Sequence, residues 1–252
     1  MEKKGSRLVS ILAPIVTFFL LFLFWEVIVT VNNIPKWLLP APLRIFRTMI
    51  TGFPEFWPHI WVTFRTILLG FLCAVPIGVL LATLITTSPL LSAALSPYVI
   101  VLVTTPLVTL MPIMMLFMGY GFQVRLVAVI IQSFAIVNMN TCTGILNVPL
   151  LRHELMQSLG ATKIQSLRHV IYPTAMPDIF TGIRLSAIFA TTACISAEYL
   201  GGNEGLGSQI VKYSQYIKTT ESFACIFYVT IIGLIMFGMV SYLQKKVIFW
   251  KV

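Results

Sequence analysis

The feature that most constrains this chain is a series of long apolar segments in its sequence. Each contains about 20 or more mostly apolar residues, the helical length that crosses the ~30 Å hydrocarbon core of a bilayer. The six segments are residues 9–31, 59–87, 91–118, 123–147, 176–200 and 222–243. Because lipid offers no hydrogen-bond partner to the backbone, such segments must be helices. We therefore predict an all-α integral membrane protein with about six transmembrane helices, forming one domain over residues 1–252.

The charge content supports this assignment. Only 10% of the 252 residues are charged and 58% are hydrophobic, whereas a soluble domain carries about 25% charged residues. The net charge of +9 is distributed between the apolar segments, which is typical of loops that face anionic lipid and argues against nucleic-acid binding. The first segment exceeds the ~7–15-residue apolar core of a signal peptide. We expect it to be an uncleaved span.

Lysine and arginine residues predict the orientation in the cell (inner or plasma) membrane. With the N-terminus inside, the inner ends hold nine basic residues: Lys3, Lys4, Arg7, Arg152, Lys163, Arg168, Lys245, Lys246 and Lys251. The outer ends then hold six: Lys36, Arg44, Arg47, Arg125, Lys212 and Lys218. The positive-inside rule therefore places both termini in the cytoplasm.

Motifs for bound metal, nucleotide or catalysis are absent from the sequence. The four cysteines all lie in apolar segments without a Cys-x-x-Cys pair, so neither a disulfide nor a metal site is indicated. There is no Gly-x-x-x-x-Gly-Lys-[Ser/Thr] loop and no Ser/His/Asp grouping at one depth. We expect no cofactor in this chain and no catalytic residues.

Two segments have a more specific pattern. Residues 32–58 combine basic residues with Trp37, Phe46, Phe53, Phe56 and Trp57, which predicts a short amphipathic segment with its aromatic rings at the lipid headgroups. The third apolar segment contains Pro97, Pro106 and Pro112. It is therefore expected to be bent or broken, as is tolerated where protein or a water-filled cavity covers the freed backbone.

The inner connection, residues 148–175, has the pattern of a jointed pair of helices. Leu151, Leu155 and Leu159 recur every four residues and predict one apolar face. Gly160 fits a left-handed C-terminal cap, and Thr162 with Gln165 is a capping-box signature. Pro173 is expected to stop the second helix. The pattern alone leaves open an ordinary interfacial helix that rests on lipid headgroups.

The spacing of this connection resembles that of a known family. Glu154, Gly160 and Val170-Ile171-Tyr172-Pro173 are similar to the Glu-Ala-Ala–x3–Gly–x9–Ile-x-Leu-Pro loop of ABC importer permeases. Other segments resemble the nitrate/sulfonate/taurine-type branch and cover nearly the whole chain in order. They are "FLFWEVIV" (22–29), "WLLPAPLRIFRTM" (37–49), "VTFRTILLGFLCAVPIGVLLA" (62–82), "MPIMMLFMGYG" (111–121), "MPDIFTGIRLSAIFA" (176–190) and "AEYLGGNEGLGSQI" (197–210).

The resemblance implies the type I importer fold in a homodimeric permease. It also implies two separate ABC ATPase subunits, which bind ATP and Mg, and an extracytoplasmic solute-binding protein. The 150–173 loop would be the coupling helix that docks on the ATPase. The ATPase-coupling candidates are Arg152, Glu154, Leu155, Leu159, Gly160, Ala161, Arg168 and Pro173. The chain departs from the pattern where Leu155 and Met156 replace two alanines and Tyr172 replaces leucine, which changes the fit to the ATPase groove.

Polar side chains at mid-depth are the candidates for the translocation pathway. They are Thr104, Thr105, Thr109, Asn138, Asn140, Thr141, Thr191 and Ser196. Each alone is also suited to a helix–helix hydrogen bond. Sulfonate-carrying relatives often have Arg-Pro where this chain has Val103-Thr104. That difference favours a neutral or weakly charged solute such as a vitamin or pyrimidine precursor, with a sulfonate- or nitrate-like anion still open.

Charged residues within the apolar segments have alternative interpretations. Glu26 is either functional or close enough to the interface to reach water. Arg184 is better suited to a structural contact than to substrate, and Asp178 to a helix N-terminus. The glycine-rich turn after the fifth segment is either a surface turn or, by the resemblance, the contact for the binding protein or the outer gate. Its residues are Glu198, Gly201, Gly202, Gly205 and Gly207.

Two other classes of protein fit less well. A self-sufficient secondary transporter or channel would need a coupling-ion site, usually acidic residues at the membrane midplane, where this sequence is nearly empty of them. An intramembrane enzyme would need a base and a nucleophile close together. An importer permease is therefore the preferred interpretation.

Overall fold

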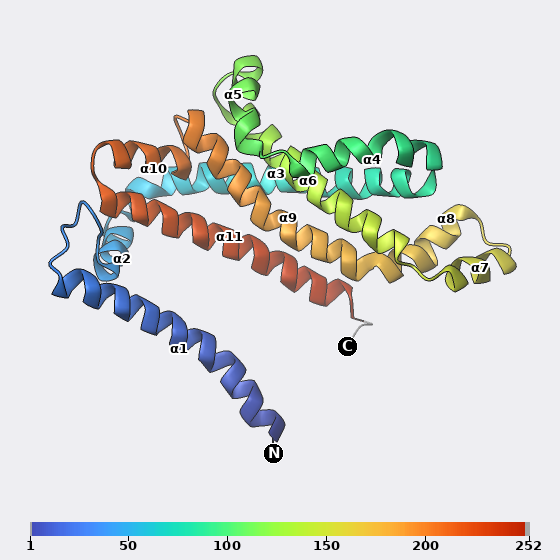
Figure 1. The fold of residues 1–252 in the computed structure, drawn as a ribbon, viewed down its shortest axis with the longest axis horizontal. Coiled ribbons are helices and arrows are strands. Elements are labelled where there is room, and N and C mark those ends of the chain that lie inside the picture. The colour runs from blue at the N-terminus through green and yellow to red at the C-terminus, as the bar shows by residue number, and fades with distance from the viewer. Residues whose placement is uncertain (1, 250–252) are drawn as a thin grey trace. The chain divides into compact units, whose positions relative to one another are not determined.

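The computed structural model describes residues 2–249, and the side chains from residue 12 onward (Figure 1). The side chains of Lys3, Lys4 and Arg7, and all of Lys251, lie outside the described residues. The described residues form helices and no strand. The helices are α1 (Glu2–Val31), α2 (Pro42–Thr51), α3 (Phe53–Thr87), α4 (Pro89–Thr104), α5 (Leu107–Met118), α6 (Phe122–Leu146), α7 (Leu150–Ser158), α8 (Lys163–Ser166), the π-helix η1 (Leu167–Ile171), α9 (Tyr172–Gly201), α10 (Leu206–Gln215) and α11 (Thr219–Val247).

Length and apolarity identify the helices that can cross a membrane. Five helical segments of the described chain qualify by themselves: Leu12–Val31, Phe53–Thr87, Phe122–Leu146, Lys163–Gly201 and Thr219–Val247. The pair α4 and α5 makes a sixth if the two helices are counted as one broken span. The prediction of an all-α membrane protein with about six spans is thus confirmed.

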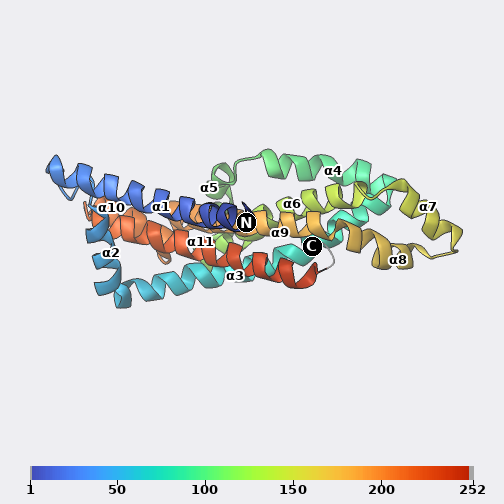
Figure 2. The same cartoon turned by 90° about the horizontal axis from the view of Figure 1, so that it is seen from below.

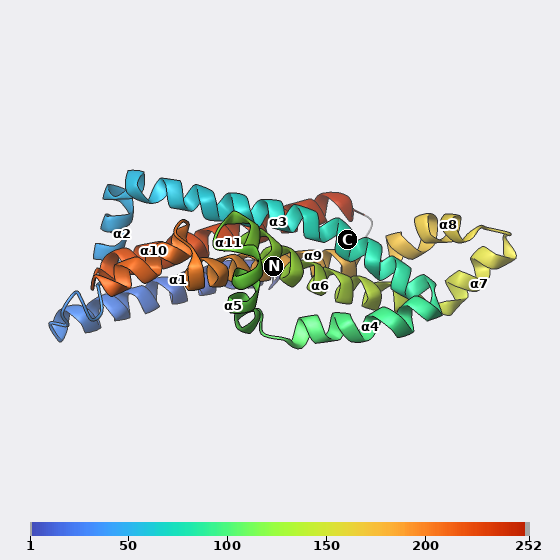
Figure 3. The same cartoon turned by 90° about the horizontal axis from the view of Figure 1, so that it is seen from above.

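The sixth candidate span is broken where the prolines predicted a break. Helices α4 and α5 meet at an angle of 102°, which is visible in Figures 1 and 3. Thr105 and Pro106 have extended backbone between them. Because Pro106 has no N–H to donate, the helix cannot continue through it without loss of a backbone hydrogen bond. Pro97 and Pro112 remain inside α4 and α5.

The chain divides into two compact units. The larger unit comprises His59–Ser208 and the chain from Tyr228 onward. Its centre is the pair α6 and α9, which lie side by side (Figures 2 and 3). Small residues allow this close approach, as is usual between membrane helices. A Cβ atom at Gly182 of α9 would lie 2.6 Å from the Cβ of Asn140 of α6, and one at Gly144 of α6 would lie 2.8 Å from the Cβ of Asp178 of α9.

The smaller unit comprises Met1–Pro58 and Gln209–Phe227, and contains the expected amphipathic segment as α2. Ile45 and Met49 are buried, whereas Leu43 and Ile50 are 70% and 78% exposed. The Glu26 carboxylate accepts a hydrogen bond from the Leu43 N–H at 3.0 Å, so it satisfies one of the free donors at the start of α2. Glu26 therefore has a structural partner within this unit.

The expectation that all five aromatic residues of 32–58 lie at the headgroups is wrong for Phe56. That side chain is fully buried, with its ring centroid 6.0 Å from that of Tyr213 on α10. The reason is that the first turn of α3 packs this side chain against α10. Trp37, Phe53 and Trp57 are exposed.

Candidate functional site

Helix α7 and the segment after it form a joint between the C-terminal end of α6 and the N-terminal end of α9 (Figures 1 and 2). Gly160 follows α7 with φ +69°, the left-handed region that favours glycine. The Gly160 N–H donates to the Gln157 carbonyl at 2.9 Å, and the Ala161 N–H donates to the Met156 carbonyl at 3.0 Å. These two bonds define a Schellman motif. The predicted glycine cap is confirmed.

The capping box that opens the next helix is also confirmed. The Thr162 hydroxyl accepts from the Gln165 N–H at 3.3 Å, and the Gln165 side chain accepts from the Thr162 N–H at 2.8 Å. The stop of one helix and the start of the other are therefore both fixed by local hydrogen bonds. Only the backbone of residues 159–162 separates α7 from α8.

The prediction that Pro173 stops the second helix is wrong. Helix α8 continues through η1 into α9, so that Lys163–Gly201 is one helical segment of 39 residues. In the π-turn the Tyr172 N–H donates to the Leu167 carbonyl, five residues back. Such a turn inserts an extra residue and widens the helix, and this gives the Pro173 ring room at the start of α9. The second arm of the joint is thus the beginning of a spanning helix.

The apolar side chains of the joint are not covered by the rest of the chain. Leu151 and Leu159 are 75% and 72% exposed, and Leu155 and Ile164 are exposed as well. No residue of α7 or α8 is buried. Large exposed apolar side chains beside charged ones indicate an interaction surface.

The charged coupling candidates lie on the same surface. Arg152, Glu154 and Arg168 are all exposed. Glu154 forms no ion pair within the part of the chain that the structure describes. Its carboxylate is therefore available to another molecule.

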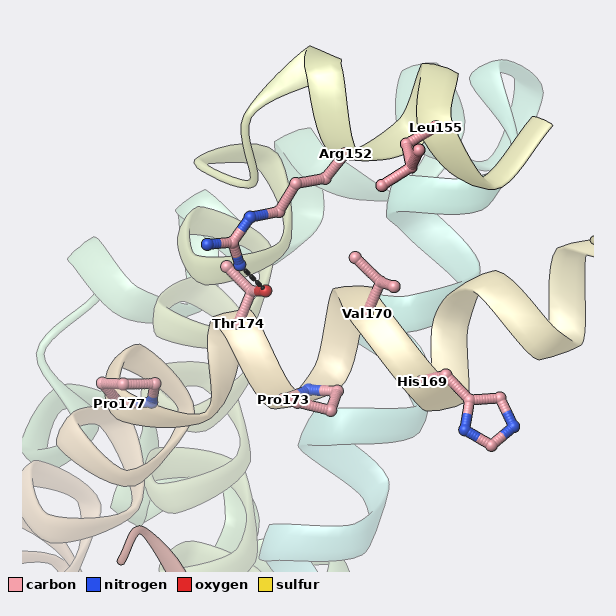
Figure 4. Close-up of a pocket in the computed structure, with 7 residues that line it drawn as sticks. All are labelled: Arg152, Leu155, His169, Val170, Pro173, Thr174 and Pro177. Atoms are coloured by element: carbon pink, nitrogen blue, oxygen red, sulfur yellow. Dashed lines mark hydrogen bonds between the residues drawn. The ribbon is translucent and has the colours of Figure 1, made fainter. Parts of the chain in front are cut away.

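A pocket of about 570 Å³ opens between α7 and the start of α9 (Figure 4). Leu155 and Val170 line it from opposite sides, and His169 lies at its edge. The Arg152 guanidinium donates to the Thr174 hydroxyl across the pocket. This bond joins the two arms of the joint.

A second pocket of about 230 Å³ lies on another side of α7. Met156 and Ala161 line it together with Thr86 and Thr87 at the end of α3. Two of the residues that depart from the family pattern, Leu155 and Met156, thus line different pockets. The third, Tyr172, has its hydroxyl 2.6 Å from the Thr83 hydroxyl of α3.

The polar pathway candidates are distributed over the α4–α5 break, α6 and α9. Four donate to carbonyls of their own helix or its cap, which is the ordinary use of such side chains: Thr104, Thr109, Asn140 and Thr191. Asn138 joins two helices, because its Nδ2 donates to the Gly78 carbonyl of α3 at 3.2 Å. Thr141 is buried with no partner for its hydroxyl among the described residues. Thr105 and Ser196 are half-buried. Their role in a pathway stays a prediction.

The glycine-rich turn after α9 is built around a buried carboxylate. Glu198 is 0% exposed, so it cannot itself touch a partner protein in this conformation. Its oxygens accept from the Thr63 hydroxyl at 2.9 Å and from the Gly207 N–H at 2.9 Å. The Thr63 hydroxyl also accepts from the Leu206 N–H at 2.9 Å. Helix α3 and the turn are therefore joined through one side chain of α9.

Two residues of this cluster were not expected from the sequence. Arg125, counted among the basic residues at the outer ends of the apolar segments, is only 3% exposed and belongs to the first turn of α6. Its Nη1 donates to the Glu204 carbonyl at 2.9 Å, and its Nε donates to the Gly121 carbonyl at 3.2 Å. Thr63 is one of several threonines in α3 that the sequence does not distinguish. The sequence signal that could have indicated this cluster is the presence of an arginine and a glutamate near the ends of two apolar segments.

Gly205 shows why the turn contains glycine. Its φ is +94°, and a Cβ atom there would lie 2.1 Å from the Glu198 carboxylate. Gly207 is also close to Glu198, with 2.7 Å between its ideal Cβ and the Glu198 Cβ. The turn is packed onto the carboxylate, and the outer-gate role of its glycines stays a prediction.

Arg184 and Asp178 have contacts that suit structural roles. The Arg184 guanidinium lies 5.5 Å from the centroid of the Phe237 ring, a cation–π contact between α9 and α11. The expectation that Asp178 lies at a helix N-terminus is wrong. It lies inside α9, beside Gly144 of α6, because the continuous helical segment already begins at Lys163. No group of three or more potential metal ligands occurs among the described residues.

Comparison with known proteins gives one consistent result. Residues 74–249 match the family described as binding-protein-dependent transport system inner membrane component. The chain is 27% identical to the formylaminopyrimidine transport permease protein of Halalkalibacterium halodurans over 98% of both chains. It is 26% identical to the taurine transport system permease protein of Escherichia coli, over 93% of this chain and 88% of that one.

A solved structure has the same fold. A chain of the MetNI methionine ABC transporter in inward-facing conformations superposes with a TM-score of 0.63 at 18% sequence identity. The match covers 77% of this chain and 96% of the other. The chain therefore belongs to the binding-protein-dependent transport system inner membrane component family, and is a multi-pass ABC importer permease subunit rather than an enzyme.

Proposed function

We propose that this chain forms the solute pathway of an ATP-driven importer and is driven by a separate ATPase through α7 and α8. The observation that carries this proposal is the exposed apolar side of the joint, above all Leu151, Leu155 and Leu159. Desolvated apolar anchors usually dominate the energy of an interface. Arg152, Glu154 and Arg168 would fix the register of docking by their charges.

The connections of the joint suit it to transmit a displacement. Residues 147–149 alone separate α6 from α7, and α8 runs without interruption into α9. The bond between Arg152 and Thr174 joins the arms, and the contact between Tyr172 and Thr83 joins α9 to α3. A push on α7 would therefore reach three helices of the larger unit. Coupling further requires that the contact with the ATPase differ in free energy between two states.

Membership in the family supports a proposal for the remaining partners. We propose a homodimer of this chain with two ATPase subunits, which would bind ATP and Mg, and an extracytoplasmic binding protein that delivers the solute. The orientation with both termini in the cytoplasm belongs to this proposal, because it places α7 on the side of the ATPase. Uptake by this chain alone, without ATP, would contradict it.

For the solute we propose a small neutral or weakly charged molecule, such as a pyrimidine precursor. The candidate pathway side chains are hydroxyls and amides, and Val103-Thr104 supplies no cation. The relative from Halalkalibacterium halodurans is named for formylaminopyrimidine and that from Escherichia coli for taurine, so an anionic sulfonate is the second candidate. Equilibrium binding of both classes to the cognate binding protein decides between them, and preference for the sulfonate or for nitrate would overturn the first.

The test of coupling is a substitution on the exposed face. Leu155→Ser with Leu159→Ser should leave the permease folded, because neither side chain is buried, but weaken binding of the ATPase at least tenfold. Co-purification and ATP-driven uptake in proteoliposomes measure the two effects. Leu43→Ser, at an equally exposed leucine of α2, is the matched control and should retain both. Unchanged ATPase binding by the double variant would mean that α7 is only an interfacial helix.

A further inference from the structure

A pocket in the smaller unit is lined by three basic side chains. It has a volume of about 290 Å³ and is formed by residues 36–48 and 217–221. Lys36, Arg44 and Lys218 supply the cations. The other lining residues are Trp37, Thr48, Ile217, Thr219, Thr220 and Glu221.

The charge of this pocket is not balanced from within. Glu221 is its one carboxylate, against three cations. Among the described residues, none of Lys36, Arg44 and Lys218 forms an ion pair. Three cations that line one cavity repel one another, and an anion in the cavity relieves that repulsion.

A hydrogen bond from a side chain to the backbone holds the two sides of the pocket together. The Thr219 hydroxyl donates to the Trp37 carbonyl at 2.6 Å, which links the segment after α1 to the start of α11. The Lys218 N–H donates to the Tyr213 carbonyl at 2.8 Å, and Ile217 has φ +57°. Lys36 and Lys218 therefore lie on two segments that have a defined conformation.

The helix that supplies Arg44 also carries an apolar stripe. Leu43 and Ile50 of α2 are exposed on its free side, while Ile45 and Met49 are buried. Exposed apolar side chains next to basic ones on an amphipathic helix are typical of the boundary between acyl chains and headgroups. The pocket thus lies beside a surface that suits an acyl chain.

From these observations we infer that the pocket formed by Lys36, Arg44 and Lys218 binds a phosphate group at the membrane surface. The phosphate could belong to the headgroup of an acidic phospholipid or be free inorganic phosphate. Both would place oxygens among the same three cations. The apolar stripe of α2 gives the lipid an additional contact that free phosphate lacks.

The inference is tested on the full-length chain in detergent. Native mass spectrometry with added phosphatidylglycerol measures the lipid that each variant retains, and a parallel titration uses radiolabelled inorganic phosphate. The triple variant K36Q/R44Q/K218Q should bind phosphatidylglycerol at least tenfold more weakly, since each cation near a lipid headgroup contributes roughly a fivefold factor in affinity. Lys212→Gln, on α10 and outside the pocket lining, is the matched control and should bind normally.

The outcomes distinguish a lipid headgroup from free phosphate, and they also test the inference itself. Phosphatidylglycerol retained by the native chain, lost by the triple variant and not displaced by phosphate identifies a lipid site. Displacement by phosphate, also lost in the variant, identifies a soluble anion in the same pocket. The variant K36R/K218R keeps the charges and should retain binding, which separates charge loss from misfolding. Equal binding by the native chain and the folded triple variant would overturn the inference. The inference does not depend on the proposed transport function.

Discussion

Arg125 and Glu198 lie together inside the protein, with 3.9 Å between the guanidinium Nη1 and the carboxylate Oε1. Charge-assisted hydrogen bonds are shorter, at about 2.7–2.9 Å. Each residue has nearer partners: Arg125 donates to the Glu204 carbonyl, and Glu198 accepts from the Gly207 N–H. The pair therefore holds the turn from two sides, and each charge also offsets the burial of the other.

The first prediction concerns the loss of one of these charges. Glu198→Gln should lower the free energy of unfolding by about 1–3 kcal/mol, because it leaves a buried arginine without its counter-charge. The loss reaches about 3 kcal/mol only if Glu204 does not replace the missing counter-charge. Its carboxylate lies 3.5 Å from the guanidinium and is mostly exposed. Thermal or denaturant unfolding of the purified protein measures the change. Arg125→Gln in the same background should be less than additive, whereas strict additivity would show that the two charges do not interact.

A second prediction follows from the position of Gly205 against the same carboxylate. Gly205→Ala should destabilise the protein by about 2 kcal/mol or more, since it combines a strained φ with a steric clash. Gly238→Ala is the matched control: it lies in α11 with nothing within 4 Å of its ideal Cβ, and should be neutral or stabilise by up to about 1 kcal/mol. Removal of the carboxylate by Glu198→Ala should reduce the penalty at Gly205. An identical penalty in both backgrounds would assign the whole effect to the backbone.

The third prediction tests the joint without disturbing its packing. Gly160 has φ +69°, but a Cβ there would meet nothing within 4 Å, so a substitution affects only the backbone conformation. Gly160→Val should lower ATP-driven uptake and uncouple ATPase stimulation, while the complex still assembles. Gly160→Asn should largely restore both, because asparagine enters the left-handed region more readily than other residues. Uptake by the valine variant at the native rate would remove the glycine cap from the coupling mechanism.

A feature of this structure can be predicted from the sequence when the residues that determine it lie close together along the chain. The cap at Gly160 and the box at Thr162 follow from residues within a few positions, and the sequence predicts both. The α4–α5 break follows from Pro106 in the same way. Hydropathy predicts the spans, because the bilayer sets their length and the backbone must be satisfied within each helix.

Features formed between distant segments are not predictable in this way. Arg125 and Glu198 come from different helices, and no local pattern relates them. The positive-inside rule therefore counts Arg125 only as one of the basic residues at the outer ends, although its side chain is buried. Pro173 shows a different limit: a proline normally ends a helix, but the π-turn before it changes the hydrogen-bond register. Phe56 is buried because α10 packs against it, which hydropathy does not report.

The last prediction concerns the contact that ties the joint to α3. The Tyr172 and Thr83 hydroxyls are 2.6 Å apart, and the Thr83 hydroxyl also donates to the Val79 carbonyl at 2.8 Å. The tyrosine is therefore the donor between the two side chains, since one hydroxyl has a single hydrogen. Tyr172→Phe removes that donor and should cost about 0.5–1.5 kcal/mol in the free energy of unfolding.

If the contact also transmits motion, Tyr172→Phe should lower the coupling of ATP hydrolysis to uptake more than it lowers stability. The control is Tyr98→Phe, at an exposed tyrosine of α4, which should change neither. Thr83→Val should reproduce the effect of Tyr172→Phe, and the double variant should resemble either single one, because both remove the same bond. Additive losses, or native coupling in Tyr172→Phe, would show that the joint reaches α3 by packing rather than through this hydrogen bond.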